Sequence, residues 1–69
     1  MAGMIGLQGR VTGRIGPGLV GEVIVQVRGG AEAFLAYPVT PGERIETGTQ
    51  IVVVEYQAPR TVYVAAAFG

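Results

Sequence analysis

Few side-chain types in this chain could carry out chemistry. Glu, Tyr, Arg and Thr are present, but the sequence contains no His, Cys, Ser, Asp, Asn, Lys or Trp. General acid–base catalysis falls mostly to His, Asp, Glu and Lys, and covalent catalysis uses Ser, Cys, Thr or Lys beside an activating base. Transition-metal sites need His or Cys ligands. We therefore predict that the chain is not an enzyme and holds neither a metal ion nor a cofactor.

Two motifs share features with cofactor sites. Residues 16–21 read Gly-Pro-Gly-Leu-Val-Gly and match G-x-G-x-x-G. A dinucleotide fingerprint must open a helix whose N-terminus meets the pyrophosphate, whereas residues 22–25 continue as a strand, so a turn is the better interpretation. Residues 41–49 and the Val run after them are similar to biotinyl and lipoyl carrier domains. Those domains attach their group to a lysine, which this chain lacks.

Aromatic and basic side chains indicate a third chemistry, the stacking of single-stranded nucleic acid in a basic groove. The available residues are Phe34, Tyr37, Tyr56, Tyr63 and Phe68, with Arg10, Arg14, Arg28, Arg44 and Arg60. Five acidic residues balance the five arginines, so no general attraction to nucleic acid or anionic lipid is expected. Nucleic-acid binding is therefore the alternative function. The other explanation for these aromatic and basic residues is that the aromatics fill the core and the arginines are solvated or paired with Glu.

Short strands must position these side chains. Residues 7–15 alternate, with Leu7, Gly9, Val11, Gly13 and Ile15 on one face. Further strands are predicted at residues 19–28, 31–37, about 50–57 and 60–66, the last with Val62 and Val64 inward and Tyr63 outward. Turns are expected at Gly16-Pro17-Gly18 and, as a primed hairpin turn, at Gly29-Gly30. The long connection, residues 38–49, is expected to contain no helix and to plug one end of the core with Ile45.

Five short strands at this spacing predict an all-β fold. Closure into a barrel removes exposed sheet edges, and a small five-stranded Greek-key barrel of the OB type fits the strand count. The long connection between the third and fourth strands favours it over the alternative, an SH3-like barrel. The barrel domain is predicted to span residues 7–66, with an N-terminal extension at 1–6 and a C-terminal tail at 67–69. Neither a signal peptide nor a transmembrane helix is apparent. The strand pattern already begins at Leu7, which is consistent with a fragment of a longer protein.

The β-branched run at residues 51–54 leads the fourth predicted strand. If Val52, Val54 and Tyr56 face the core, Ile51 and Val53 face outward. With outward residues of the second and fifth strands they form a candidate protein-interaction surface, because a contiguous apolar patch marks such a site. Its members are Val20, Ile24, Ile51, Val53 and Tyr63, with Phe34 as a further candidate. The alternative is that loop 38–48 or the tail covers these residues.

The whole pattern resembles the C-terminal domain of NfeD-like proteins. The resemblance is carried by Leu7-x-Gly9-Arg10-Val11, Pro17-Gly18-x-Val20-Gly21-Glu22-Val23-x-Val25, Gly29-Gly30, Phe34-Leu35-Ala36-Tyr37, Ile45-Glu46-x-Gly48-Thr49-x-Ile51-Val52-Val53-Val54-Glu55 and Thr61-Val62-x-Val64. It covers nearly the whole chain, and the stretch from Ile45 to Glu55 is its most specific part. One departure is the proline-rich loop at residues 38–41.

The resemblance implies a five-stranded OB-type barrel without an intervening helix. It also implies that the domain hangs from transmembrane helices, in an aqueous compartment, within a membrane protein. Longer members add a serine-protease-like domain that uses Ser and Lys, neither of which occurs in this chain. The family is associated with stomatin-, prohibitin- and flotillin-type membrane scaffolds. We therefore expect a non-catalytic module that binds such a protein or associates with itself.

Overall fold

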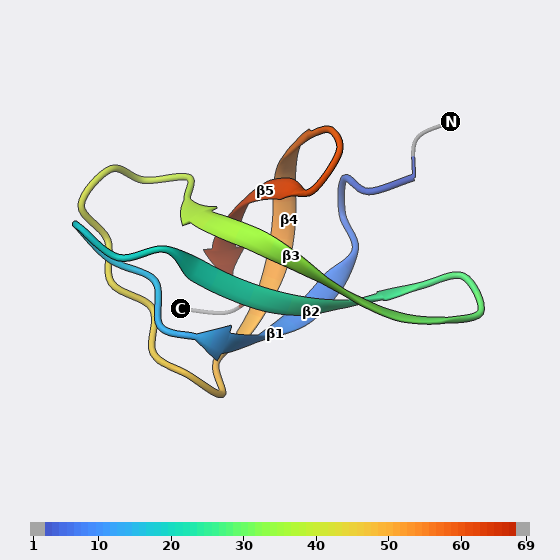
Figure 1. The fold of residues 1–69 in the computed structure, drawn as a ribbon, viewed down its shortest axis with the longest axis horizontal. Helices are drawn as coiled ribbons and strands as arrows, with labels where there is room; N and C mark the ends of the chain where they lie inside the picture. Colours follow the sequence, from blue (N-terminus) through green and yellow to red (C-terminus); the bar gives the residue numbers. More distant parts are fainter. Residues whose placement is uncertain (1–2, 68–69) are drawn as a thin grey trace.

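A computed structural model describes residues 3–67 and shows a closed five-stranded barrel (Figure 1). The strands are β1 (Gln8–Gly13), β2 (Gly21–Val27), β3 (Gly30–Pro38), β4 (Gln50–Gln57) and β5 (Thr61–Ala66). Their order around the barrel is β1-β2-β3-β5-β4, and β4 closes against β1. All neighbouring strands are antiparallel except β3 and β5, which are parallel. The exchange of β4 and β5 gives Greek-key connectivity, which agrees with the predicted OB-type barrel.

The predicted N-terminal extension and C-terminal tail include residues that the structure does not describe. The strands run from Gln8 to Ala66. Residues 1–2 of the predicted N-terminal extension and residues 68–69 of the predicted tail, including Phe68, lie outside the described part of the chain. Within residues 3–67, no helix has the length and apolar character needed to cross a bilayer.

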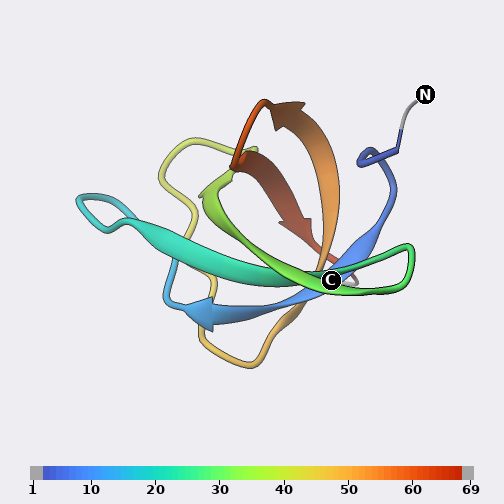
Figure 2. The same ribbon diagram turned by 45° about the vertical axis from the view of Figure 1, so that its right-hand side comes forward.

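The core is built from alternate side chains of all five strands. Its members are Val11, Ile15, Val23, Val25, Phe34, Ala36, Ile45, Ile51, Val53, Val62 and Val64, and no polar side chain of the described residues is buried with them. Ile45 and Ile15 exchange two backbone hydrogen bonds, of 2.9 and 3.0 Å, and thereby close one end of the barrel. The connection between β3 and β4 therefore passes beside the β1–β2 loop (Figure 2). This confirms the prediction that Ile45 plugs the core.

A bulge in β4 reverses the predicted orientation of that strand. Val53 pairs with Val64 of β5 and Glu55 pairs with Tyr63, so Val54 is an extra residue between two paired positions. The two residues predicted to face outward, Ile51 and Val53, are 0% and 1% exposed, so that prediction is wrong.

The pairing of β4 gives the physical reason. Val53 lies opposite the buried Val64, so Ile51 and Val53 share the inner side of the sheet. Val52 and Val54, predicted to face the core, lie outside it. Tyr56, also predicted to face the core, pairs with the buried Val62 beyond the extra residue, but it is 41% exposed and does not belong to the core.

A second bulge lies in β1. Val11 pairs with Val23, but Gly13 pairs with the exposed Glu22, so Thr12 is the extra residue. Gly13 therefore leaves the inner face, where the alternation had placed it. Gly9 stays there and pairs with both β2 and β4; a Cβ on Gly9 would collide with the Ile24 carbonyl oxygen. A glycine is needed at this point because two strands meet there.

The hairpin joining β2 and β3 turns one residue earlier than predicted. Val27 pairs with Gly30, so Arg28 and Gly29 form the turn. Gly29 has a φ of 82°, while no residue other than glycine has a positive φ within residues 3–67. A positive φ at the second turn position only is the pattern of a type II turn, so the predicted primed turn is wrong.

Candidate interaction surface

The structure separates the five residues that were predicted to form one interaction surface. Ile51 and Val53 lie in the core, out of reach of any partner. Val20 is 68% exposed in the loop before β2. Ile24 is half-buried on the outer side of β2, and Tyr63 is half-buried on the outer side of β5. Phe34, the further candidate, is also a core residue.

Of the predicted residues that reach the surface, Tyr63 lies beside a second aromatic side chain. It lies beside Tyr37 of β3 in the parallel ladder, and the two ring centroids are 5.8 Å apart with an angle of 34° between the planes. Several neighbouring ladder positions on the same outer side are also apolar, although Glu55 lies opposite Tyr63 and Thr61 lies beside Leu35. Together these residues form the surface we call the Tyr63 face: Leu35, Tyr37, Val39, Val52, Val54, Tyr63 and Ala65.

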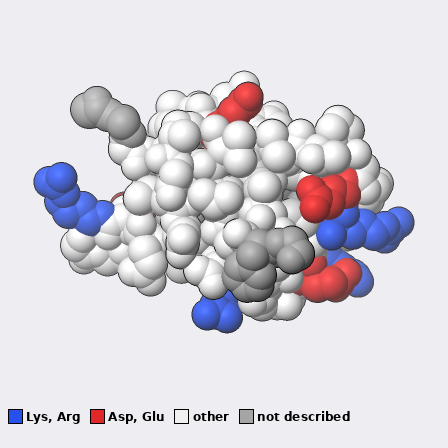
Figure 3. Space-filling model, turned by 180° about the vertical axis from the view of Figure 1, so that it is seen from behind, with Lys and Arg blue, Asp and Glu red and all other residues white. Residues whose placement is uncertain are grey.

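The Tyr63 face is partly open to solvent, and its own members are uncharged. Leu35 is 43% exposed and Val54 is 38% exposed, and the other members are half-buried. Two charged residues border the face: Glu55 lies opposite Tyr63, and Glu22 of β2 lies opposite Leu35. The space-filling view from behind Figure 1 shows charged side chains mainly toward the edges of the molecule, with uncharged residues of all kinds between them (Figure 3). A contiguous apolar surface of this kind on a small domain is typical of a protein-binding site.

Sequence reasoning missed most of the Tyr63 face. The alternation of Leu35, Tyr37 and Val39 was present in the chain and could have identified one apolar row. It could not show that this row lies beside Tyr63, because the parallel pairing of β3 with β5 joins segments that are distant in sequence.

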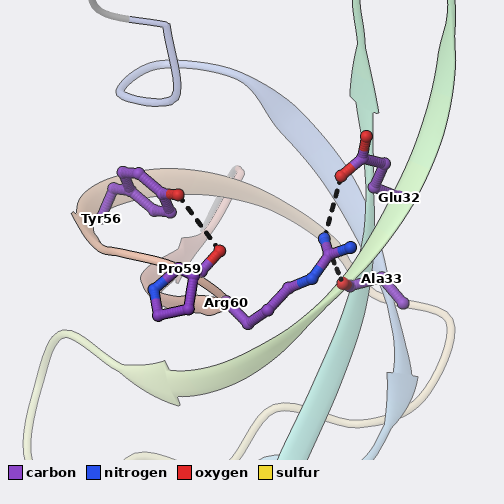
Figure 4. Close-up of polar contacts among 5 residues, drawn as sticks. All are labelled: Glu32, Ala33, Tyr56, Pro59 and Arg60. Atoms are coloured by element: carbon purple, nitrogen blue, oxygen red, sulfur yellow. Dashed lines mark hydrogen bonds and ion pairs between the residues drawn. The ribbon is translucent and has the colours of Figure 1, made fainter.

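Tyr56 and Arg60 make polar contacts on either side of the β4–β5 turn, with Pro59 and with Glu32 and Ala33 (Figure 4). The Arg60 guanidinium lies 5.2 Å from the centre of the Phe34 ring, and its Nη1 donates a 2.9 Å hydrogen bond to Glu32 Oε1. The Tyr56 ring meets Phe34 edge-on, with the centroids 6.4 Å apart, and its hydroxyl donates to the Pro59 carbonyl oxygen over 3.1 Å. These groups bind one another within the monomer.

A groove of about 350 Å³ follows the outer side of β1. It is lined by Gln8, Gly9, Arg10, Thr12, Ile24, Gln26 and Gln50. This lining contains one arginine and no aromatic side chain, while the stacked tyrosines lie on the Tyr63 face. This groove therefore lacks the aromatic side chains on which the bases of a single strand would stack.

Comparison with known proteins identifies a family to which the chain is similar. A family model described as the NfeD C-terminal domain matches residues 8–65, which include β1 to β4 and nearly all of β5. No curated protein and no solved structure matches the chain. The matched segment contains both the Tyr63 face and the groove along β1.

Proposed function

The chain belongs to the NfeD C-terminal domain family, and from this premise we propose that it is a non-catalytic protein-interaction module of a membrane-anchored NfeD-like protein. In this proposal the domain lies in an aqueous compartment and works with scaffold proteins of the stomatin, prohibitin or flotillin type. Self-association through the same surface is the other form of the proposal. The Tyr63 face is the observation that carries it.

The composition of the Tyr63 face suits an interface. Tyrosines supply large contact areas and are enriched at interface hot spots. The tilted packing of Tyr37 against Tyr63 already restricts both rings, which lowers the side-chain entropy that binding would cost. Leu35 and Val54 keep much of their surface in water, so neither loop 38–48 nor the described part of the tail covers them.

Two substitutions on the Tyr63 face and one outside it test the proposal. In Leu35→Glu and Val54→Glu, a charge enters the face at an exposed position, where it should leave the fold intact. In Val20→Glu, the same charge enters an apolar site on the β1–β2 loop that is still more exposed. Circular dichroism spectra establish that all three variants are folded.

Binding is then measured by titrating the ¹⁵N-labelled domain with a stomatin-type fragment, and self-association by sedimentation. Amide shifts should cluster on β3, β5 and β4, and each Glu variant of the face should weaken binding by about tenfold, equivalent to about 1.4 kcal/mol. Val20→Glu should bind like the wild type. Shifts centred on Val20, or equal affinity in all three variants, would refute the surface. A wild-type domain that neither binds the fragment nor self-associates would refute the function.

A further inference from the structure

The groove along β1 is a second surface, separate from the Tyr63 face, and we propose that it binds an extended peptide segment carrying an acidic side chain. This inference goes beyond the proposed function, because it assigns a different site and a different ligand chemistry. The volume of about 350 Å³ lies within the range of about 300–1,000 Å³ that is usual for ligand pockets.

Carboxamides dominate the groove. Three of the four glutamines of the chain, Gln8, Gln26 and Gln50, come together there from β1, β2 and β4. Gln50 Nε2 donates a 2.7 Å hydrogen bond to Gln8 Oε1, which holds these two side chains in place. The bond leaves the Gln8 amide N–H groups and the Gln50 carbonyl oxygen available. A donor and an acceptor beside each other complement a peptide group, which offers one of each.

Arg10 supplies the single charge of the groove. Its Nη1 donates to the Gly48 carbonyl oxygen over a long 3.4 Å, and within residues 3–67 no carboxylate pairs with it. Arg14 and Arg60, by contrast, each form an ion pair with a glutamate. A guanidinium presents five donors in a fork that matches a carboxylate, so Arg10 is suited to an acidic side chain.

The charge distribution also orients the ligand. Thr12, two residues after Arg10 on β1, also lines the groove and donates a 2.8 Å hydrogen bond to Glu22 Oε1, so the part of the groove beside Thr12 is next to a negative charge. An acidic group on the ligand is therefore favoured beside Arg10 and disfavoured beside Thr12. A nucleic acid would present phosphates along the whole groove, and no aromatic side chain lines it for stacking.

Side-chain amide resonances give a direct test. The ¹⁵N-labelled domain is titrated at low salt with a short capped peptide containing one Glu, and with the same peptide containing Gln instead. The side-chain amides of Gln8, Gln26 and Gln50 should shift, while Gln57, the fourth glutamine, lies outside the groove and should not. The Glu peptide should bind about fivefold more tightly, as an exposed ion pair worth about 1 kcal/mol allows.

Matched variants identify the source of any preference. Arg10→Gln should abolish the preference for Glu, and Arg28→Gln, which removes the same charge at the β2–β3 turn, should retain it. Equal binding of the two peptides, no shift of the groove glutamines, or equal effects of the two variants would overturn the proposal. Tighter binding of a short oligothymidylate at the same resonances would overturn it as well. Leu35→Glu should leave this titration unchanged, so failure of this proposal and failure of the Tyr63 face are distinguishable.

Discussion

Truncation of neighbouring valines in β4 tests the register on which both proposed surfaces depend. Val53 is 1% exposed and packs in the core, whereas Val54 is the extra residue of the bulge and is 38% exposed. Val53→Ala and Val54→Ala remove the same two methyl groups from adjacent positions of one strand. A large difference between the two variants can therefore come only from their environments.

The expected loss follows from burial. Burial of the two methyl groups that Val53→Ala removes contributes about 0.8 kcal/mol each, which amounts to about 1.6 kcal/mol of lost transfer free energy. The cavity left in a close-packed core raises this to about 2–3 kcal/mol. A single core of this size supplies roughly 3–5 kcal/mol in total, so Val53→Ala should remove half or more of the free energy of unfolding. Val54→Ala should lose about 0.5 kcal/mol or less, as is usual for exposed positions.

Urea unfolding followed by circular dichroism measures both variants against the wild type. The midpoint should fall strongly for Val53→Ala and barely for Val54→Ala, with an unchanged slope. Equal losses in the two variants, or a larger loss for Val54→Ala, would show that the bulge is misplaced. In that case the outward row of β4 would revert to Ile51 and Val53, and the Tyr63 face would lose its β4 members.

Three further predictions concern the barrel itself. Gly21→Ala places a Cβ against a buried isoleucine and within 2.7 Å of a β3 carbonyl oxygen, so it should destabilise the domain by about 1–3 kcal/mol in urea unfolding. In the control variant Gly30→Ala, the new Cβ meets open space. An equal loss of stability in the two variants would contradict this account. A double-mutant cycle on Tyr37 and Tyr63 should yield a coupling of about 0.5–1.5 kcal/mol in urea unfolding, and zero coupling would mean that the rings do not stack. Arg60→Ala should lower the free energy of unfolding by about 1 kcal/mol or less in thermal unfolding, because the Arg60–Glu32 ion pair is exposed. A much larger loss of stability would show that the packing of Phe34 and Tyr56 depends on Arg60.

Local alternation was enough to predict most of the fold. The five strands were located within a few residues, Val62 and Val64 face inward, and Tyr63 faces outward, as the pattern at residues 60–66 required. Turn residues and the prolines of the long connection separated the strands. These features depend on neighbours in sequence, since alternate side chains of a strand always point to opposite sides.

What the sequence alone determined is therefore a five-stranded closed sheet with few chemically active side chains; the tertiary structure decided which residues are available to a partner. In the run of β-branched residues at 51–54 every position is apolar, so no polar side chain marks the outer face, and a shift of one residue exchanges the two faces. Only pairing with both β1 and β5 places Ile51 and Val53 in the core and makes Val54 a bulge. The parallel pairing of β3 with β5 likewise creates the Tyr63 face, because it joins residues that no local pattern relates.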